Sequence, residues 1–433
     1  MVGKPSRTRT ISRRISESSL INASSWDIEM HYHLMGLASG KYNSLVLQAP
    51  MPFNLFKLPI KDTYLFDYFQ FTASRSLTTF GYDPTSMGKV LIRMALTSSS
   101  PSSAAVLHSL LALSSLHRYG LQNQAGELKL SALKALAAAS RTAIGPVEAA
   151  QHIAAGMLLC SFELHRASCT SGQWRCYVGG VKKIINVSSS GVSGRDGDFS
   201  ILLDWVYYHD VLSRFSELHW RSEKDIVIAP ACSSEYPWKT AIPSTVSNFA
   251  TTVRLLSDLC DTVAARPLQM APAEQLSHYI ANIQILAFRI RHIPMSMPGD
   301  EAIISPKYAT MTELFQLSML VYLNRATGNL LEPSHMTEQR IHQGLAILSQ
   351  LDTCERQFPL LVLGCEARTD EERVRILDLI ERTEESTSSR SSFLVKTLIT
   401  SIWVQNDLAG GQLDYMEKLS SLISCCNIMP TFV

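Results

Sequence analysis

Residues 106–117 read Val-Leu-His-Ser-Leu-Leu-Ala-Leu-Ser-Ser-Leu-His, and their apolar positions show the period of an α-helix. Val106, Leu110, Leu113 and His117 recur at steps of four, three and four residues, which places them on one face of a helix. A half-buried strand would alternate apolar and polar residues instead. The segment therefore predicts an amphipathic helix whose Leu-rich face packs against a core.

The same period returns along most of the chain. Apolar stripes at helical spacing run through residues 153–164, 174–184, 249–263, 276–290 and 341–351. In the fourth of these, the positions predicted to face the core are Leu276, Ile280, Ile283, Leu286 and Ile290. Since no stretch shows the repeated short alternation of a sheet, we predict an all-α protein with a single large multi-helix domain.

Helix start signals and breaks give the domain organisation. Ser305-Pro306 has the N-cap and first-turn proline of a helix start, and Thr369 with Glu372 has the spacing of a capping box. Gly-, Ser- or Pro-rich breaks are predicted at 188–199, 229–243, 294–300 and 384–392. We predict a disordered basic arm over 1–25, a poorly regular lead-in over 26–59, and the helical domain over 60–425.

Composition limits the function classes. Apolar residues make up 46% of the 433 residues and charged residues 18%, against about 25% charged in an average chain, so the chain is built to bury a large core. No apolar run reaches the roughly 18 residues of a membrane span, and we expect no membrane segment. The formal net charge is +1, with 39 basic and 38 acidic residues.

The basic charge is concentrated at the start of the chain. Five cations and no acid lie in the first 14 residues, namely Lys4, Arg7, Arg9, Arg13 and Arg14. The remaining 419 residues carry 34 basic and 38 acidic side chains. A protein that binds nucleic acid phosphates by itself normally has an excess of basic side chains, so this balance disfavours unaided binding. The arm fits a nuclear import patch, a mitochondrial presequence or a plain disordered arm. Ser16 follows Arg13-Arg14-Ile15 as in sites of basic-directed kinases.

Cysteines and histidines do not form a metal-binding pattern. There are nine cysteines and no C-x-x-C pair, which excludes a disulfide framework and favours buried thiols in a reducing compartment. His31 and His33 lack a third ligand nearby, so a polar patch is the favoured interpretation over a zinc site. We predict neither a metal nor a cofactor.

Catalytic motifs are missing from the sequence. The Gly191-Val192-Ser193-Gly194 segment is closest to a nucleophile elbow, but it lacks the second glycine at the required place and no strand precedes it. His209 and Asp210 are adjacent, and adjacent helical residues point about 100° apart, so a buried polar pair joining helices is favoured over an acid–base site. We therefore expect no enzymatic activity.

An aromatic stripe surrounds that pair. Trp205, Tyr208, Leu212 and Phe215 recur at helical spacing, with Leu218 and Trp220 further on. Such stripes form the core in most proteins, and the alternative is the wall of an apolar cavity for a small ligand.

Three segments in order resemble one known family. Residues 204–216, with Asp204-Trp205-Val206-Tyr207-Tyr208-His209-Asp210, resemble the central helix of the fungal-specific transcription factor domain. Residues 108–117 are similar to its early "LLALSALH" helix. Residues 358–367, followed by 372–377, are similar to its late "PLFxxGCEA...ER" element, and Trp403 and Asp407 lie on a helix like the one that closes the family's domain.

The resemblance implies an all-helical regulatory region of a zinc-cluster (Zn2Cys6) regulator. Family members carry an N-terminal six-cysteine cluster that opens C-x2-C-x6-C, whereas the first cysteine here is Cys160, so we expect this chain to lack the cluster. Several positions of this chain match the family's motifs, and the resemblance implies that their side chains either are structural or line a ligand cavity. They are Trp205, Tyr208, His209, Asp210, Phe215, Pro359, Gly364, Cys365, Glu366, Arg373 and Trp403. The layout also resembles that of regulators of trichothecene mycotoxin clusters, which lack the zinc cluster.

The resemblance supports three hypotheses of function. The first is a nuclear transcriptional regulator of a secondary-metabolite gene cluster, which acts through a DNA-binding factor, a co-regulator or a second copy, with weak or absent DNA binding of its own. The second is a helical module that senses a small apolar ligand and controls a partner. The third is an enzyme of the same pathway, for which no constellation of nucleophile, base or metal emerges.

Overall fold

The fold is described from a computed structural model of the chain. It describes residues 28, 31, 62–77, 84–141, 145–165, 172–188, 197–220, 248–267, 272–294, 306–387, 392–409, 414–426 and 429–433. The predicted import patch, Ser16, His33, the Gly191–Gly194 segment and the boundary between arm and lead-in lie outside these residues. They remain predictions.

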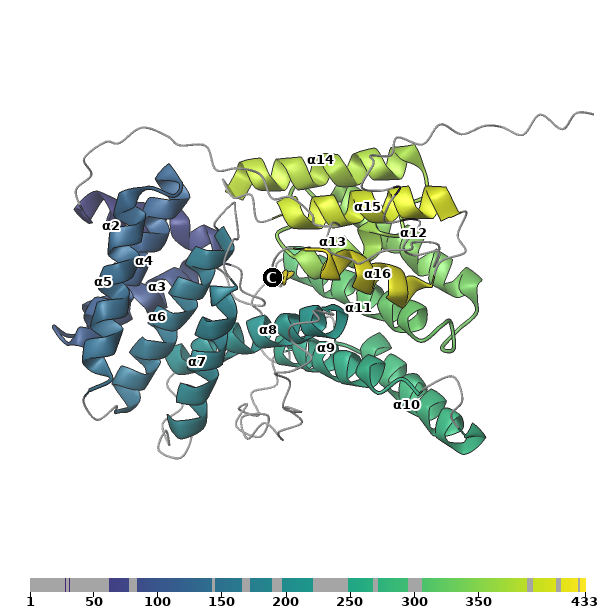
Figure 1. Ribbon diagram of the computed structural model, residues 1–433, viewed down its shortest axis with the longest axis horizontal. Helices are drawn as coiled ribbons and strands as arrows, with labels where there is room; N and C mark the ends of the chain where they lie inside the picture. The colour runs from purple at the N-terminus through teal and green to yellow at the C-terminus, as the bar shows by residue number, and fades with distance from the viewer. Residues whose placement is uncertain are drawn as a thin grey trace, which may run out of the picture.

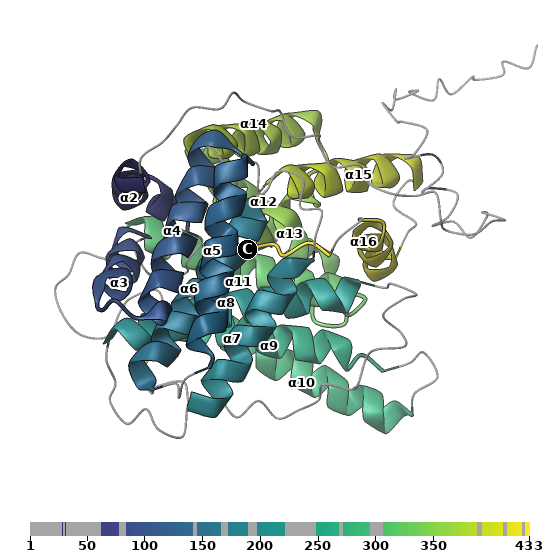
Figure 2. The same cartoon turned by 60° about the vertical axis from the view of Figure 1, so that its left-hand side comes forward.

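The first half of the described chain forms a helical bundle, at the left of Figure 1. We call α2–α7 with the short 3-10 helix η1 the N-terminal bundle. Its elements are α2 (Asp62–Phe71), η1 (Ala73–Ser76), α3 (Pro84–Leu96), α4 (Pro101–Tyr119), α5 (Asn123–Ala139), α6 (Pro146–His165) and α7 (Gln173–Ser188). Figure 2, turned so that this bundle comes forward, shows α4, α5 and α6 running side by side.

The second half forms a second group of helices, at the right of Figure 1. We call α9–α16 the C-terminal lobe. Its elements are α9 (Asn248–Ala264), α10 (Ala273–Arg291), α11 (Pro306–Ala326), α12 (Ser334–Gln350), α13 (Gln357–Gly364), α14 (Asp370–Thr387), α15 (Phe393–Ala409) and α16 (Tyr415–Ser424). The long helix α8 (Gly197–His219) lies between the two groups and contacts α6 and α7 on one side and α9 and α16 on the other.

The all-α prediction is confirmed: the described residues form 15 α-helices and one 3-10 helix, with no strand. Ser100 caps α4 by accepting a hydrogen bond from the Ser103 N–H, and Gly120 ends it with a φ of 72°, a conformation that suits glycine. The predicted capping box forms before α14, where the Thr369 hydroxyl accepts from Glu372 N–H and the Glu372 carboxylate accepts from Thr369 N–H. α14 continues to Thr387, beyond the predicted break at 384.

The predicted stripes form one continuous core. Val106, Leu110 and Leu113 of α4 are fully buried, and most of α6 is buried on every side because α6 is surrounded by other helices. The predicted stripe of α10 is partly wrong. Leu276 is 39% exposed, and the buried face is formed instead by Tyr279, Ile283, Leu286, Ala287 and Ile290.

The C-terminal tail lies between the bundle and the lobe, where Figure 1 marks the end of the chain. Met429 packs with Cys160 of α6 and with Trp174 and Val178 of α7. Phe432 packs edge-on against Phe215 of α8, with ring centroids 5.5 Å apart. The short tail therefore joins α6 and α7 of the bundle to α8.

Candidate functional site

The α8 helix carries a buried ion cluster at its centre. Asp210 is 1% exposed, and its carboxylate lies 2.6 Å from Lys182 Nζ of α7 and 3.3 Å from Arg214 Nη2, one turn further along α8. Arg214 Nη1 also donates to Ser257 Oγ of α9 at 3.0 Å. Asp210 therefore ties α8 to α7 directly and to α9 through Arg214.

His209 faces a different environment from its neighbour in the chain. Its ring lies edge-on to Trp205 and to Tyr208, with centroids 6.0 Å away in both cases, and all three side chains are buried. Since Asp210 is engaged by Lys182 and Arg214, the adjacent His209 and Asp210 belong to separate contacts. Asp210 joins α8 to α7, whereas these ring contacts of His209 lie within α8.

The aromatic stripe of α8 is packed as core. Trp205 and Tyr208 belong to the same buried cluster as Leu212 and Phe215. Burial raises the pKa of the Tyr208 phenol to about 12, so it stays neutral. Two surface hollows lie elsewhere, one of about 460 Å³ between α9 and α10 and one of about 140 Å³ between α12 and α14. Neither borders this stripe.

Phe215 is the centre of an aromatic cluster that joins α8 to the C-terminal lobe. Its ring meets those of Tyr322, Phe358 and Phe432 edge-on, with centroids 5.2, 5.1 and 5.5 Å away. These partners come from α11, α13 and the C-terminal tail. Edge-to-face pairs at this separation add stabilisation beyond the burial of their area.

His219, the last residue of α8, connects the same elements by hydrogen bonds. Its Nδ1 lies 2.9 Å from Ser420 Oγ of α16, and its Nε2 lies 2.7 Å from the Tyr322 hydroxyl of α11. Both ring nitrogens are thus engaged, and His219, Tyr322 and Ser420 are all fully buried. A substrate has no access to this chain of polar groups, so it acts as a structural bridge.

The late signature residues form a second cluster, on α13, α14 and α15. Trp403 Nε1 donates to the carbonyl of Gly364 at 2.8 Å, so α15 covers the end of α13. A Cβ on Gly364 would lie 2.9 Å from Ile399 Cδ1, which explains the glycine at this close approach. Pro359 and Cys365 are buried beside it.

Arg373 of α14 completes this cluster. Its guanidinium makes a two-pronged pair with the Asp407 carboxylate of α15, both contacts 2.7 Å, and lies over the Trp403 ring at 5.5 Å. The Asp407 pair raises the pKa of Arg373 above its usual value. The planar fork of arginine matches a carboxylate in this geometry, so α14 is held to α15 at a fixed angle.

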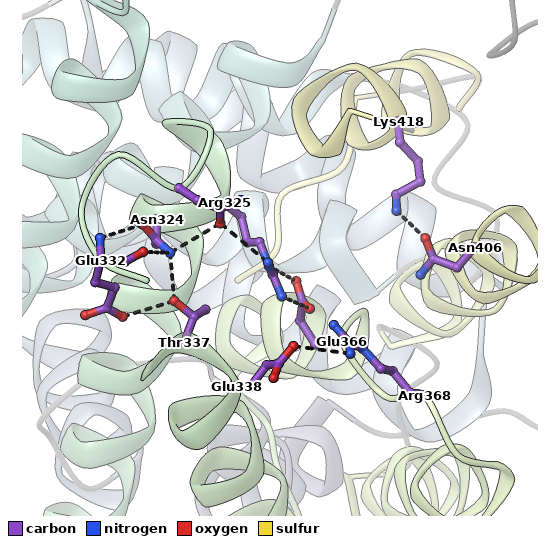
Figure 3. Close-up of polar contacts among 10 residues, drawn as sticks. Asn324, Arg325, Glu332, Thr337, Glu338, Glu366, Arg368, Asn406 and Lys418 are labelled. Atoms are coloured by element: carbon purple, nitrogen blue, oxygen red, sulfur yellow. Dashed lines mark hydrogen bonds and ion pairs between the residues drawn. The ribbon is translucent and has the colours of Figure 1, made fainter. Parts of the chain in front are cut away.

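Glu366, which follows α13, connects this cluster to α11. Figure 3 shows its carboxylate facing the guanidinium of Arg325, with two contacts of 3.1 and 3.0 Å. The adjacent Asn324 donates to Thr337 Oγ1 at 2.7 Å and accepts from the N–H groups of Leu331 and Glu332. These bonds fix the turn between α11 and α12.

A buried lysine, Lys418, lies near Cys365 and Glu366. Lys418 of α16 is 8% exposed and donates to Asn406 Oδ1 of α15 (Figure 3). Burial lowers its pKa, and the nearby Cys365 and Glu366 oppose this shift. Burial also raises the pKa of the Cys365 thiol, which keeps that thiol protonated and unreactive.

The structure thus arranges the predicted signature residues in two clusters. Trp205, Tyr208, His209, Asp210 and Phe215 lie along α8, and the later ones lie on α13–α15. They meet through Phe358, the residue before Pro359, which contacts Phe215. Sequence reasoning missed His219, Tyr322, Phe432, Arg325 and Lys418. Of these residues, His219 could have been found from the sequence, because it follows Phe215 by one helical turn and so lies on the same face of the helix.

Within the described residues, no group of three or more His, Cys, Asp or Glu side chains is placed to hold a metal ion. No helix of the described chain is long and apolar enough to cross a membrane.

Residues 64–426 match the family model described as "Fungal specific transcription factor domain". The chain belongs to this family. It is also 41% identical, over 400 residues, to a protein of Pestalotiopsis fici described as "Transcription factor iacI", and the alignment covers 90% of this chain and 100% of the relative. No solved protein structure matched the chain.

Membership of the family confirms the resemblance predicted from the sequence. Both the family and the relative are described as transcription factors. The chain is therefore a transcriptional regulator and not an enzyme.

Proposed function

We propose that the protein is a nuclear regulator of a fungal secondary-metabolite gene cluster. The observation that carries this proposal is the alignment with a transcription factor over 90% of the chain and the whole of that relative. The trichothecene mycotoxin pathway is the narrower proposal, because the size and layout of the chain resemble those of that pathway's regulators.

We further propose that the regulator reaches DNA through a DNA-binding factor or co-regulator. Three arginines of the described fold are largely buried and already paired with carboxylates, so they are not available to phosphates. Arg214 pairs with Asp210, Arg325 with Glu366 and Arg373 with Asp407. The chain after residue 14 carries fewer basic than acidic side chains, and this balance disfavours the electrostatic attraction on which unaided DNA binding depends.

Transcript profiling of a deletion strain tests the regulatory role. We expect transcripts of one contiguous gene cluster to change together, and reintroduction of the intact gene to restore them. A strain that loses the pathway product while its transcripts stay intact would contradict the proposal.

Chromatin precipitation in strains with and without a candidate DNA-binding partner tests whether the regulator reaches DNA through that partner. Promoter occupancy should vanish when the partner is absent.

A fluorescent fusion tests the nuclear location separately. Alanine at Lys4, Arg7, Arg9, Arg13 and Arg14 should abolish nuclear accumulation if the arm is the import patch. The matched control removes five exposed cations elsewhere, namely Lys89, Lys134, Arg141, Lys183 and Arg254. Import that persists in the arm variant would exclude the arm, and Ser16→Ala in the same fusion shows whether modification there alters import.

A further inference from the structure

Residues 429–433 are buried although they form neither helix nor strand. Met429, Phe432 and Val433 are each at most 5% exposed. Figure 2 shows these residues as an extended yellow segment that lies among the helices. Irregular segments normally run over the surface, because their backbone N–H and C=O groups need water or other partners. We call residues 429–433 the strap.

Apolar side chains hold the strap in place. Within the described part of the chain, residues 429–433 make no hydrogen bond. Met429 packs with Cys160, Trp174 and Val178, and the Phe432 ring packs against Phe215. We call these four partner residues the strap site. Since apolar contacts are non-directional, the strap can leave its site as a unit without breaking a polar network.

Two features raise the free energy of the docked strap. Phe432 has a φ of 52°, a left-handed conformation that an aromatic residue rarely adopts. The indole N–H of Trp174 is buried at the strap site and has no acceptor among the described residues. A buried donor without an acceptor is unfavourable. The docked strap is therefore less stable than the burial of its side chains suggests.

We propose that the strap is displaceable and that the strap site binds an extended apolar segment of a partner protein when the strap is released. The docked strap then acts as an internal competitor of that segment. Local opening of this kind needs few contacts to break, because the strap is short and lacks hydrogen bonds. The inference does not depend on the proposed gene target, since it is tested on the purified chain.

The strap itself shows which chemistry the site accepts. Its sequence, Met-Pro-Thr-Phe-Val, carries no charge and has two large apolar side chains three residues apart. Cys160, Trp174, Val178 and Phe215 of the site are buried, and none of them offers a charged partner. The partner segment is therefore neutral and extended, with two large apolar side chains at this spacing. A backbone carbonyl of that segment is the acceptor that the Trp174 indole lacks.

Native-state thiol labelling of the purified full chain tests whether the strap is released. Val433→Cys places a thiol of similar size on the buried strap, and Val321→Cys places one in the fully buried part of α11. Because a buried thiol reacts only when its segment opens, we expect the strap thiol to react at least about 100-fold faster. Peptide mass spectrometry separates both from the native cysteines, and unchanged circular dichroism melts establish folding. Equal rates would overturn the proposal.

A second substitution tests the anchor of the strap. Phe432→Ala, added to Val433→Cys, removes the ring that packs against Phe215 and should increase the labelling rate further. Thr431→Ala is the matched control on the same segment, at a half-buried side chain, and should leave the rate unchanged. A rate that Phe432→Ala does not change would overturn the docking of the strap through this ring.

A capped peptide, Met-Pro-Thr-Phe-Val, tests whether the site accepts a separate segment. The tethered strap has a high effective concentration, so the peptide is added at millimolar concentration to the Val433→Cys chain. A bound peptide keeps the strap out, and labelling of the strap thiol should accelerate until the site is saturated. A peptide with alanine in place of Met and Phe should have no effect. No acceleration, or equal acceleration by both peptides, would overturn the partner site.

Discussion

The N-terminal bundle and the C-terminal lobe are held together by different means. In the bundle, close packing of small residues lets helices approach. A Cβ on Gly156 of α6 would lie only 2.5 Å from Val181 of α7. In the lobe, forked arginine–carboxylate pairs join the helices, as between Arg373 and Asp407. Glycines at close approaches occur in both regions, so the difference is that the lobe adds forked arginine–carboxylate pairs between its own helices.

Buried polar groups show the same difference. The hydroxyls of Ser109, Ser114 and Ser115 in α4 are buried and have no hydrogen-bond partner among the described residues. Asn324 of α11 is equally buried, but its amide bonds to the turn that follows and to Thr337. The three serines of α4 thus serve close packing, whereas Asn324 fixes a turn by hydrogen bonds.

The largest expected effect is at the cluster that joins the two regions. Phe215→Ala removes a fully buried ring that contacts three other aromatic rings, and we expect it to lower the free energy of unfolding by about 4 kcal/mol. Denaturant unfolding measures this. The matched control is Phe71→Ala in the bundle, where the ring is 63% exposed, with an expected change below about 0.5 kcal/mol. Equal effects of the two substitutions would contradict the role of Phe215.

Glycine substitution probes the packing difference directly. Gly156→Ala forces a methyl group against the stiff Val181 side chain, and we expect a loss of about 2 kcal/mol in the free energy of unfolding. Gly344→Ala in the lobe meets the flexible end of Leu363 at 2.8 Å, where the gain in helix propensity offsets the contact, so we expect almost no change. Thermal melts of the pair check this, and the reverse order would refute the assignment.

Acid should weaken the bundle through His165 at the end of α6. Burial lowers the pKa of this ring to about 4 from an ordinary 6.5, so the unfolded chain binds its proton more tightly. Stability is full above the ordinary value and is lost as pH falls toward about 4. We expect the loss to be about 1.5 kcal/mol, because the His165 side chain is only half-buried and solvent screens its charge. His165→Gln should flatten this part of the stability–pH profile. His335→Gln, on an exposed side chain, should leave the profile unchanged.

The smallest effect is at Lys418 in the lobe, where we expect substitution to raise the free energy of unfolding instead of lowering it. Burial lowers the pKa of Lys418, so the unfolded chain binds this proton more tightly and stability rises as pH increases toward the ordinary lysine value of 10.5. Lys418→Met removes the buried charge, and we expect a gain of about 1 kcal/mol at neutral pH and loss of the alkaline rise. Urea unfolding at neutral and alkaline pH measures both. A clear loss of stability would mean that its bond to Asn406 dominates, and Lys183→Met is the exposed control.

Much of the secondary structure could be predicted because its signals are local. The stripe of α4, the capping box at Thr369 and Glu372, and the helix start at Pro306 all depend on residues within one or two turns. The prediction for α10 was partly wrong because both of its faces carry apolar side chains. A period of 3.6 residues predicts the helix, but it does not show which face neighbouring helices cover.

The candidate site was predicted only in part, because only some of its residues lie in segments with a local sequence signal. Motif likeness found Asp210, Gly364 and Arg373, which lie in segments that resemble the family. Lys182, Arg325 and Lys418, the partners of these segments, have no sequence pattern of their own. Their roles come from helices that fold back against one another.

The sequence by itself determined the all-α class, most helix positions and the family, because helical period, caps and motifs are properties of neighbouring residues. Only the tertiary structure showed that α8 connects the N-terminal bundle to the C-terminal lobe. His219 and Ser420, which hydrogen-bond there, are 201 residues apart in the chain. Contacts over such a distance depend on how many helices pack at once, and that packing free energy belongs to the whole fold and not to any one segment.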